Sequence, residues 1–212
     1  MLELRNITKT YDSIILSSIN FMLEEGKSVA IVGSSGTGKT TLLNIASLLD
    51  VPTSGEIFYF KKKVEAKDYS EIRRNFISFV YQQHNLMPEF SIFENIKLVC
   101  EIKNSYNKNT VIKLLEEVGL TNVMHKTPDQ LSGGQKQRAS IVRAIACGSK
   151  IIFADEPTGN LDSYLADVSS NLLINLAKNQ GIAIFLITHN NDIAKKCDAI
   201  FTIKDFNLTK HF

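Results

Sequence analysis

The stretch of sequence that decides the fold is Gly33-Ser34-Ser35-Gly36-Thr37-Gly38-Lys39-Thr40. It follows the pattern G-x-x-x-x-G-K-[ST], in which glycines let the backbone turn tightly enough for successive N–H groups to point at phosphate oxygens. A helix predicted from Thr40 to about Leu49 would add the positive end of its dipole. Lys39 would then reach the β- and γ-phosphates of a nucleotide, and the Thr40 hydroxyl would bind Mg²⁺. The segment therefore predicts a phosphate-binding loop.

The surroundings of this loop support the prediction. The loop directly follows Ser28–Val32, a short apolar run without polar alternation. Two further runs of this kind, Ile151–Ala154 and Ala183–Thr188, also precede polar or turn-forming segments. Continuous apolar strands are typical of a parallel sheet that is covered by helices on both faces. Because ligands bind beyond the carboxyl ends of such strands, we expect the three following segments to meet at one edge.

The rest of the chain predicts a single α/β domain, residues 1–212, with two additions. From about 88 to 148 the pattern is helical, and Val111, Leu114, Leu115 and Val118 recur at three-to-four spacing. We interpret this stretch as a helical subdomain inserted into a core of about 1–87 and 149–212. An N-terminal antiparallel sheet is predicted from three β-rich segments, Leu2-Glu3-Leu4, Ile14-Ile15-Leu16 and Ile57–Phe60.

Composition and charge narrow the possible function classes. Lys and Arg total 24 against 22 Asp and Glu, a net charge of +2, which is too balanced for binding driven by bulk attraction to nucleic acid. Three widely spaced cysteines, Cys100, Cys147 and Cys197, argue against a disulfide framework or a zinc site. The N-terminus lacks a signal-peptide pattern, and no apolar run approaches the ~18 residues of a membrane span. We expect a soluble, cytoplasmic protein.

Two carboxylates, Asp155 and Glu156, follow the apolar run that ends at Ala154. Asp155, at the strand tip, can hold Mg²⁺ through a water ligand. Glu156 points elsewhere and can polarise a water for in-line attack on the γ-phosphorus. A strand ending in Asp-Glu is by itself as often a solvated turn, but the phosphate-binding loop in the same chain favours the catalytic interpretation.

Two further polar side chains follow apolar strands. His189 comes after the run Ala183–Thr188, where a histidine can contact the γ-phosphate or orient the catalytic water. Gln82 comes after Phe79-Val80-Tyr81, and its neutral side chain can contact Mg²⁺ or water, although the residues alone favour an ordinary glutamine there. A lone histidine is more often structural, which is the interpretation we keep for His84, His125 and His211.

A second anion-binding segment is suggested by Leu131-Ser132-Gly133-Gly134-Gln135, which precedes a helical stripe from Lys136 to Ala146. Ser132 and the Gly133 N–H would lie at a helix N-terminus. One chain needs only one γ-phosphate site, so two copies in head-to-tail array could each bury a nucleotide between the loop of one and the helix start of the other. The same residues also fit a plain helix cap, Ser followed by Gln at the third position. The sequence leaves both interpretations open.

The whole set of motifs, in this order, resembles the ATP-binding cassette family over nearly the whole chain. The motifs that carry the resemblance are the phosphate-binding loop, Gln82, Leu131–Gln135, Asp155-Glu156, Gly159-Asn160-Leu161-Asp162 and His189. The resemblance implies a P-loop nucleoside-triphosphatase core with a parallel sheet. It also implies hydrolysis of ATP to ADP and phosphate coupled to transport, ATP and Mg²⁺ as ligands, and a homodimer that sandwiches the ATP.

The resemblance assigns roles to individual residues. Tyr11 would stack on adenine, and Asp162 would link the two sites across the dimer. Catalysis is assigned to Glu156, His189, Lys39 and Gln82, and the binding of Mg²⁺ to Thr40, Gln82 and Asp155. The implied contacts with ATP are Tyr11, Gly33, Ser34, Ser35, Gly36, Thr37, Gly38, Lys39, Thr40 and Thr41 from one copy, and Ser132, Gly133, Gly134 and Gln135 from the other.

Finer features resemble the lipoprotein-releasing and macrolide-exporter ATPases, in the segments Leu49–Gly55, Asn85–Phe90 and Ala154–Asp162. They imply a peripheral subunit on the cytoplasmic face of a bacterial inner membrane, bound to integral membrane permease subunits. Leu86, Met87 and Phe90 could receive a helix of that partner. The family usually has Asp after the histidine, whereas Asn190 stands here. An alternative is an ATP-dependent regulatory module of a complex that controls wall hydrolases in cell division.

Overall fold

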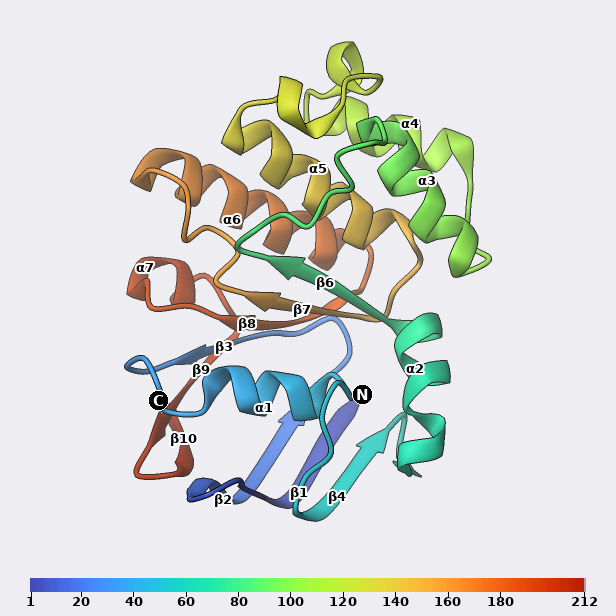
Figure 1. Ribbon diagram of the computed structural model, residues 1–212. Coiled ribbons are helices and arrows are strands. Elements are labelled where there is room, and N and C mark those ends of the chain that lie inside the picture. The colour runs from blue at the N-terminus through green and yellow to red at the C-terminus, as the bar shows by residue number, and fades with distance from the viewer. Residues whose placement is uncertain (212) are drawn as a thin grey trace.

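The computed structural model describes residues 1–211 and contains two β-sheets with helices between and outside them (Figure 1). The strands are β1 (Leu2–Thr10), β2 (Ile14–Leu23), β3 (Ser28–Val32), β4 (Ser54–Tyr59), β5 (Lys62–Val64), β6 (Ile77–Tyr81), β7 (Ile151–Asp155), β8 (Ala183–Ile187), β9 (Ala199–Lys204) and β10 (Asn207–His211). The α-helices are α1 (Lys39–Ala46), α2 (Tyr69–Phe76), α3 (Ile92–Ile102), α4 (Lys108–Glu117), α5 (Gly133–Ala146), α6 (Ser163–Asn179) and α7 (Asn191–Ala194). Short 3₁₀ turns are formed by Ala66–Asp68, Thr121–Val123 and Pro128–Gln130.

The N-terminal sheet is antiparallel, in the order β2-β1-β4-β5. Leu2 in β1 pairs with Leu23 in β2 on one side and with Tyr59 in β4 on the other. All three of these side chains are almost completely buried. The predicted antiparallel sheet is therefore confirmed.

The larger sheet has the order β10-β9-β3-β8-β7-β6, and all its neighbouring strands are parallel except β10, which is antiparallel to β9. The three predicted apolar strands are β3, β7 and β8, which lie side by side at its centre. Every residue of β8 is buried, as a strand covered on both faces requires. The predicted parallel sheet is confirmed.

Alternate residues of these strands belong to two separate cores. In β7, Ile151 and Phe153 pack with α1 and the N-terminal sheet, whereas Ile152 and Ala154 pack with α3, α4, α5 and α6. Successive side chains of a strand point to opposite faces, so the six-stranded sheet divides the molecule into two sides. Figure 1 shows α1 on one side, next to the N-terminal sheet, and α5 and α6 on the other.

The helical stretch of the sequence forms α3, α4 and α5, and α5 packs against α3, α4 and α6. Val111, Leu114, Leu115 and Val118 face its core, as their spacing indicates. The sequence separates Cys100 from Cys147, but the fold brings their free, buried Sγ atoms to 3.1 Å. The division into a core and an inserted subdomain with the predicted boundaries stays a prediction. Within residues 1–211, none of the helices combines the length and apolar character needed to span a bilayer.

Candidate functional site

The strand register brings the polar segments to one edge of the sheet. Ile31 in β3 pairs with Ile187 in β8, Ile187 pairs with Asp155 in β7, and Asp155 pairs with Tyr81 in β6. Each of these four residues is at or within one residue of its strand's carboxyl end. The phosphate-binding loop, Gln82, Glu156 and His189 follow them in the chain, so parallel pairing alone gathers these groups.

The phosphate-binding loop connects β3 to α1, and α1 begins without a side-chain cap. The residue before the helix, Gly38, has φ 95°. A Cβ atom there would lie 3.1 Å from the Ile15 carbonyl oxygen of β2, so both the backbone angle and the close approach require glycine. The first N–H groups of a helix have no partner within the helix, and here no side chain of the loop takes them. The start of α1 therefore suits an anion.

Lys39 and Thr40, the first residues of α1, place their side chains at the loop and at the strand edge. Lys39 Nζ donates hydrogen bonds to the carbonyl oxygens of Gly33 and Ser34, at 2.8 and 2.7 Å. The Thr40 hydroxyl lies 3.5 Å from Asp155 Oδ2. An ammonium bound only to carbonyl oxygens has no carboxylate to neutralise it, so it remains available to a phosphate.

Asp155 is the last residue of β7 and is half-buried. Burial raises the pKa of its carboxyl above the ordinary value, and the neighbouring Glu156 carboxylate adds to this effect, while the Thr40 hydroxyl and Lys39 oppose it. A bound cation would offset both the burial and the repulsion from Glu156, because it stabilises the ionised Asp155 carboxylate. The Thr40 hydroxyl and the Asp155 carboxylate are hard oxygen donors, of the kind that suits Mg²⁺ together with phosphate and water.

Glu156 has the unusual backbone angle φ 45° for a residue that is not glycine. Its N–H donates to the Ile187 carbonyl oxygen at 3.0 Å, and its own carbonyl oxygen accepts from Gly159 N–H at 3.0 Å. The side chain turns toward His189, whose Nδ1 lies 2.9 Å from Oε2 and whose backbone N–H donates to Oε2 at 3.3 Å. Left-handed backbone at such residues is costly and clusters at active sites. The Glu156 carboxylate is therefore held in one place beside His189.

Gln82 lies at the rim of this site and is bound to Asn160. Gln82 Nε2 donates to Asn160 Oδ1 at 2.9 Å, and Asn160 Nδ2 donates to the Gln82 carbonyl oxygen at 3.1 Å. A cavity of about 420 Å³ is lined by Gln82 together with Thr40, Asp155 and Glu156. No pattern in the sequence indicates the contact with Asn160, because the two residues are distant in the chain.

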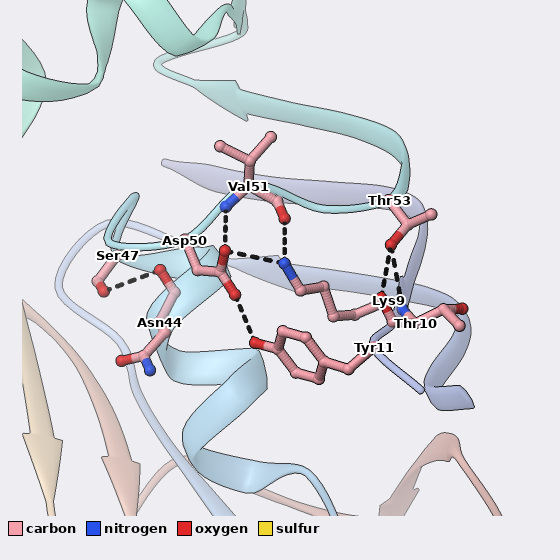
Figure 2. Close-up of polar contacts among 8 residues, drawn as sticks. All are labelled: Lys9, Thr10, Tyr11, Asn44, Ser47, Asp50, Val51 and Thr53. Carbon is pink, nitrogen blue, oxygen red and sulfur yellow. Dashed lines mark hydrogen bonds and ion pairs between the residues drawn. The ribbon is translucent and has the colours of Figure 1, made fainter. Parts of the chain in front are cut away.

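Tyr11 lies on the turn between β1 and β2, and 59% of its surface is exposed. Its hydroxyl donates to Asp50 Oδ2 at 2.7 Å, and Lys9 Nζ lies 4.7 Å from the centre of its ring (Figure 2). Tyr11 and the phosphate-binding loop line one cavity of about 350 Å³, a volume in the usual range for small-molecule sites. Sequence reasoning missed Lys9 and Asp50, because nothing in their spacing joins the two residues.

The segment Leu131–Gln135 forms a helix cap at the start of α5. The Ser132 hydroxyl accepts from Gln135 N–H at 3.3 Å, and Gln135 Oε1 accepts from Ser132 N–H at 3.0 Å. Ser132 and Gly133 are exposed, whereas Gly134 is buried against Leu165. The capping interpretation is thus confirmed, and binding to the nucleotide of a second copy stays a prediction.

Asp162 and Asn190 also cap helices. Asp162 accepts from Leu165 N–H at 2.9 Å at the start of α6, and its side chain is exposed. Asn190 Oδ1 accepts from the N–H groups of Asp192 and Ile193 at the start of α7. Asn caps a helix about as well as Asp, so the departure at this position preserves the local structure behind His189.

The residues fit a nucleotide and a divalent cation. One cavity joins the exposed Tyr11 ring to the loop, and it continues past Thr40 to Asp155 and Glu156. The uncapped helix start and Lys39 suit phosphates, and the two oxygen donors suit Mg²⁺. This arrangement, a loop of this pattern between a parallel strand and a helix beside two strand-end carboxylates, defines the class of P-loop nucleotide-binding proteins.

The particular family follows from comparison with known proteins. The family model described as "ABC transporter" matches residues 16–159, and the chain belongs to this family of ATP-hydrolysing transporter subunits. The lipoprotein-releasing system ATP-binding protein LolD of Rickettsia bellii is 41% identical over 96% of this chain and 95% of its own length. An uncharacterised ABC transporter ATP-binding protein of Methanocaldococcus jannaschii, MJ1508, is also 41% identical, over 97% and 96%.

Solved structures agree with this assignment. The ATP-binding cassette MJ0796, in a dimeric post-hydrolysis state bound to ADP and phosphate, matches with a TM-score of 0.87 and 34% identity over 100% of this chain and 98% of that one. CbiO1 of Clostridium perfringens, part of the transporter complex CbiONQ, matches with a TM-score of 0.88 and 26% identity over 98% and 86%. The fold is that of an ATP-binding cassette, and the predicted ATPase activity and ATP binding are confirmed at the level of the family.

Proposed function

We propose that this chain powers a bacterial inner-membrane complex that releases lipoproteins or exports amphiphiles, and that it works as a pair of identical subunits. The proposed class of cargo rests on one observation: the chain is 41% identical to a lipoprotein-releasing ATPase along nearly the whole of both chains. None of the relatives described above carries a name that favours the regulatory alternative.

In this proposal the residues at the strand edge divide the work of hydrolysis. The start of α1, Lys39 and the loop N–H groups bind the phosphates. Thr40 and Asp155 hold Mg²⁺, with Gln82 at the rim, and the ion supplies charge neutralisation and orientation of the phosphates. Glu156 accepts a proton from the attacking water, and the contact at 2.9 Å with His189 orients its carboxylate.

The second copy provides the remaining contacts in this proposal. Ser132, Gly133, Gly134 and Gln135 begin a helix on the side of the sheet away from α1, so they would serve the nucleotide bound by the partner. Two-fold symmetry then yields two identical composite sites. Support comes from the dimeric state of the MJ0796 cassette.

A complementation experiment tests the shared site. Gly133→Asp leaves the phosphate-binding loop intact but places a negative charge at the start of α5, where it would repel the partner's nucleotide. Lys39→Ala leaves the start of α5 intact but weakens phosphate binding by the loop. Each variant alone should be inactive, but an equal mixture should regain ATPase activity, because a mixed dimer contains one site with both halves intact. A mixture as inactive as its components would overturn the proposal of composite sites.

A groove along β6, the edge strand of the six-stranded sheet, is the proposed contact with the membrane partner. It has a volume of about 240 Å³ and lies between β6, α3 and α5, where Phe79, Tyr81 and Val99 form part of its lining. Lys103 and Arg143 also line it, and within residues 1–211 neither forms an ion pair. The Lys103 ammonium already donates to the Ile77 carbonyl oxygen and to the Ser78 and Ser149 hydroxyls, so Arg143 is the cation that a carboxylate of the partner would meet. We propose that a cytoplasmic helix of the partner enters here with apolar side chains and a carboxylate.

None of the three apolar residues predicted to receive this helix lines the groove itself. Leu86 packs against the helical core, whereas Met87 and Phe90 are each 40% exposed and would form a second part of the contact. The test is purification of the tagged chain from solubilised membranes. The expected partner has four membrane spans and a large periplasmic domain. Phe90→Asp should abolish co-purification, whereas Phe206→Asp, at a comparably exposed position on the β9–β10 turn, should not. Recovery of only soluble proteins would contradict the transport proposal.

A further inference from the structure

The segment Leu49–Gly55 leads from α1 into the first two residues of β4 and lies beside the end of β1 (Figure 2). Thr53 N–H donates to the Thr8 carbonyl oxygen at 2.9 Å, and Thr10 N–H donates to Thr53 Oγ1 at 3.0 Å. These bonds fasten the segment to the residues that immediately precede Tyr11. The end of β1 and the exit from α1 therefore form one connected unit.

Asp50 is the centre of this unit, and each of its carboxylate oxygens has its own partner. Oδ1 accepts from Lys9 Nζ at 2.8 Å and from Val51 N–H at 2.7 Å, and Oδ2 accepts from the Tyr11 hydroxyl at 2.7 Å. Burial alone would raise the pKa of Asp50, but the hydrogen bonds from Lys9 and Tyr11 lower it below its ordinary value. The carboxylate is thus ionised and binds both side chains at neutral pH.

The Tyr11 ring needs such a tether to have a fixed orientation. It stands on a turn and is mostly exposed, so packing does not hold it. An exposed aromatic side chain without a partner populates several rotamers. The hydroxyl bond to Asp50 removes this freedom, and Lys9 Nζ, 4.7 Å from the ring centre, covers one face. The other face is left for a planar ligand in the cavity that Tyr11 shares with the phosphate-binding loop.

Asp50 also ties the ring to the helix that carries the phosphate-binding loop. The N–H groups of Leu49 and Asp50 donate to the Asn44 carbonyl oxygen, at 2.7 and 3.1 Å, so Asp50 is fixed to the last turn of α1. Lys39, the first residue of the same helix, belongs to the loop. A short helix is stiff, so the ring and the loop keep a constant separation.

We propose that Asp50 is a positioning residue for the nucleotide base, which holds the Tyr11 ring at a fixed place relative to the phosphate-binding loop. The inference rests on the proposed function and on the role that the family resemblance implies for Tyr11, whose ring would stack on adenine. Base and triphosphate are then received by two surfaces that are already aligned, so binding does not have to order the ring.

The experiment compares ATP with inorganic tripolyphosphate, which has phosphates but no base, by isothermal titration calorimetry with Mg²⁺. Tyr11→Phe keeps the ring and removes the hydroxyl. It should weaken ATP binding about threefold to tenfold, the cost of ordering one side chain, and leave tripolyphosphate binding unchanged. Asp50→Asn should act in the same direction. Adding it to Tyr11→Phe should cause little further loss, because both changes weaken the same bond.

Tyr106→Phe is the matched control. Tyr106 also lies below a lysine, with Lys97 Nζ 5.8 Å from its ring centre, but its hydroxyl makes no hydrogen bond within residues 1–211 and it is outside the site. This variant should bind both ligands as the unaltered protein does. A thermal unfolding curve of each variant separates loss of fold from loss of positioning.

The remaining outcomes separate this inference from the proposed function. If Tyr11→Ala weakens ATP binding but Tyr11→Phe and Asp50→Asn do not, the ring binds the base and the positioning role of Asp50 is wrong. Equal weakening of ATP and tripolyphosphate by Asp50→Asn would show a general structural role and also overturn the inference. If the unaltered protein binds ATP no more tightly than tripolyphosphate, the stacking role of Tyr11 itself fails.

Discussion

The N-termini of α1 and α5 carry similar small and polar residues, but their surroundings differ. At α1 no side chain caps the helix, and its first two residues, Lys39 and Thr40, belong to the phosphate-binding loop. At α5 the Ser132 and Gln135 side chains cap each other's backbone N–H groups. A helix start that uses its own side chains has little unsatisfied bonding capacity, so an anion gains less from binding there than at an open one.

The residues that surround the N-termini of α1 and α5 differ as well. The start of α1 lies at the edge where Asp155, Glu156 and His189 gather, whereas the start of α5 meets Leu161 and Leu165. The six-stranded sheet separates the two helices (Figure 1). A helix N-terminus therefore becomes a catalytic site only where strand topology brings reactive groups to it. The α5 start lacks such groups in its own chain, which is why we propose that it acts on a second copy.

The largest expected effect comes from removing Glu156, the base that we propose at the α1 side. Glu156→Gln keeps the size of the side chain but cannot accept a proton, so phosphate release from ATP should fall about 100-fold to 10,000-fold. ATP binding should persist, and light scattering should show a dimer trapped by ATP and Mg²⁺. Glu117→Gln, at the exposed end of α4, is the control. A Glu156→Gln protein that stays monomeric with saturating ATP would contradict the paired arrangement.

The next prediction tests the start of α5, where one substitution should stabilise the fold of the single chain but prevent the pairing of two copies. Gly133 is exposed, and an added Cβ would make only ordinary contact, 3.7 Å from Leu161 Cδ2. In Gly133→Asp the new charge at the helix N-terminus should raise the free energy of unfolding by about 0.3–1 kcal/mol. The same charge repels a partner's phosphate, so the ATP-trapped dimer of Glu156→Gln should disappear in the double variant, as measured by light scattering.

Binding of ATP by the single chain should be unchanged in Gly133→Asp, because the phosphate-binding loop leads into α1, which lies on the other side of the sheet. A dimer that persists in the double variant would mean that the α5 start does not contact the nucleotide. Loss of ATP binding by the monomer would instead place this segment in its own chain's site.

Local patterns predicted most of what lies at the α1 side. Continuous apolar runs identified β3, β7 and β8. Because these strands pair in parallel, the segments that follow them, which contain Gly33, Glu156 and His189, lie at the same edge of the sheet. The glycine pattern predicted the loop, whose Gly38 takes the left-handed backbone that the turn requires. These features depend on short-range patterns and on general rules of sheet topology, which a single sequence contains.

Contacts between distant side chains were not predictable in the same way. The bonds of Asp50 with Tyr11 and of Gln82 with Asn160 join residues about 40 and 80 positions apart, and no periodicity marks them. The α1 helix also ends at Ala46, earlier than the apolar pattern suggested, because Leu48 adopts φ 64° and turns the chain toward Asp50. Such features depend on how the N-terminal sheet packs against α1, which a sequence does not specify residue by residue.

A smaller effect compares one glycine on each side of the sheet. Gly55 in β4 has φ 100°, and a Cβ there would lie 2.5 Å from the Asn6 carbonyl oxygen. Gly119, after α4, has φ 68° but open space around it. Chemical denaturation should show a loss of about 2–4 kcal/mol in unfolding free energy for Gly55→Ala, from strain and clash together. Gly119→Ala should lose only about 1 kcal/mol, the cost of left-handed backbone. Equal losses would mean that β1 and β4 can separate without cost.

The smallest expected effect is at the start of β3, the strand that leads into the phosphate-binding loop. Asp198 Oδ2 accepts from the N–H and the hydroxyl of Ser28, both at 2.8 Å, and Lys27 Nζ lies 3.4 Å from Oδ1. The backbone hydrogen bond from Ser28 is the main cause that lowers the pKa of Asp198. A carboxyl whose pKa is lower in the folded than in the unfolded state stabilises the fold above the unfolded pKa, and this contribution is lost as the pH falls through the folded value.

Asp198→Asn should therefore cost about 0.5–1 kcal/mol at pH 7, a small value because water reaches the carboxylate and screens it. As the pH falls below about 4, the ordinary range of an aspartate, the unaltered protein also loses the charge, and the difference between the two should shrink. Urea denaturation at several pH values measures this difference. ATP binding at pH 7 should not change, because Asp198 is at the end of β3 that is opposite to the phosphate-binding loop. A difference that grows on acidification would mean that the Asp198 carboxylate does not stabilise this strand.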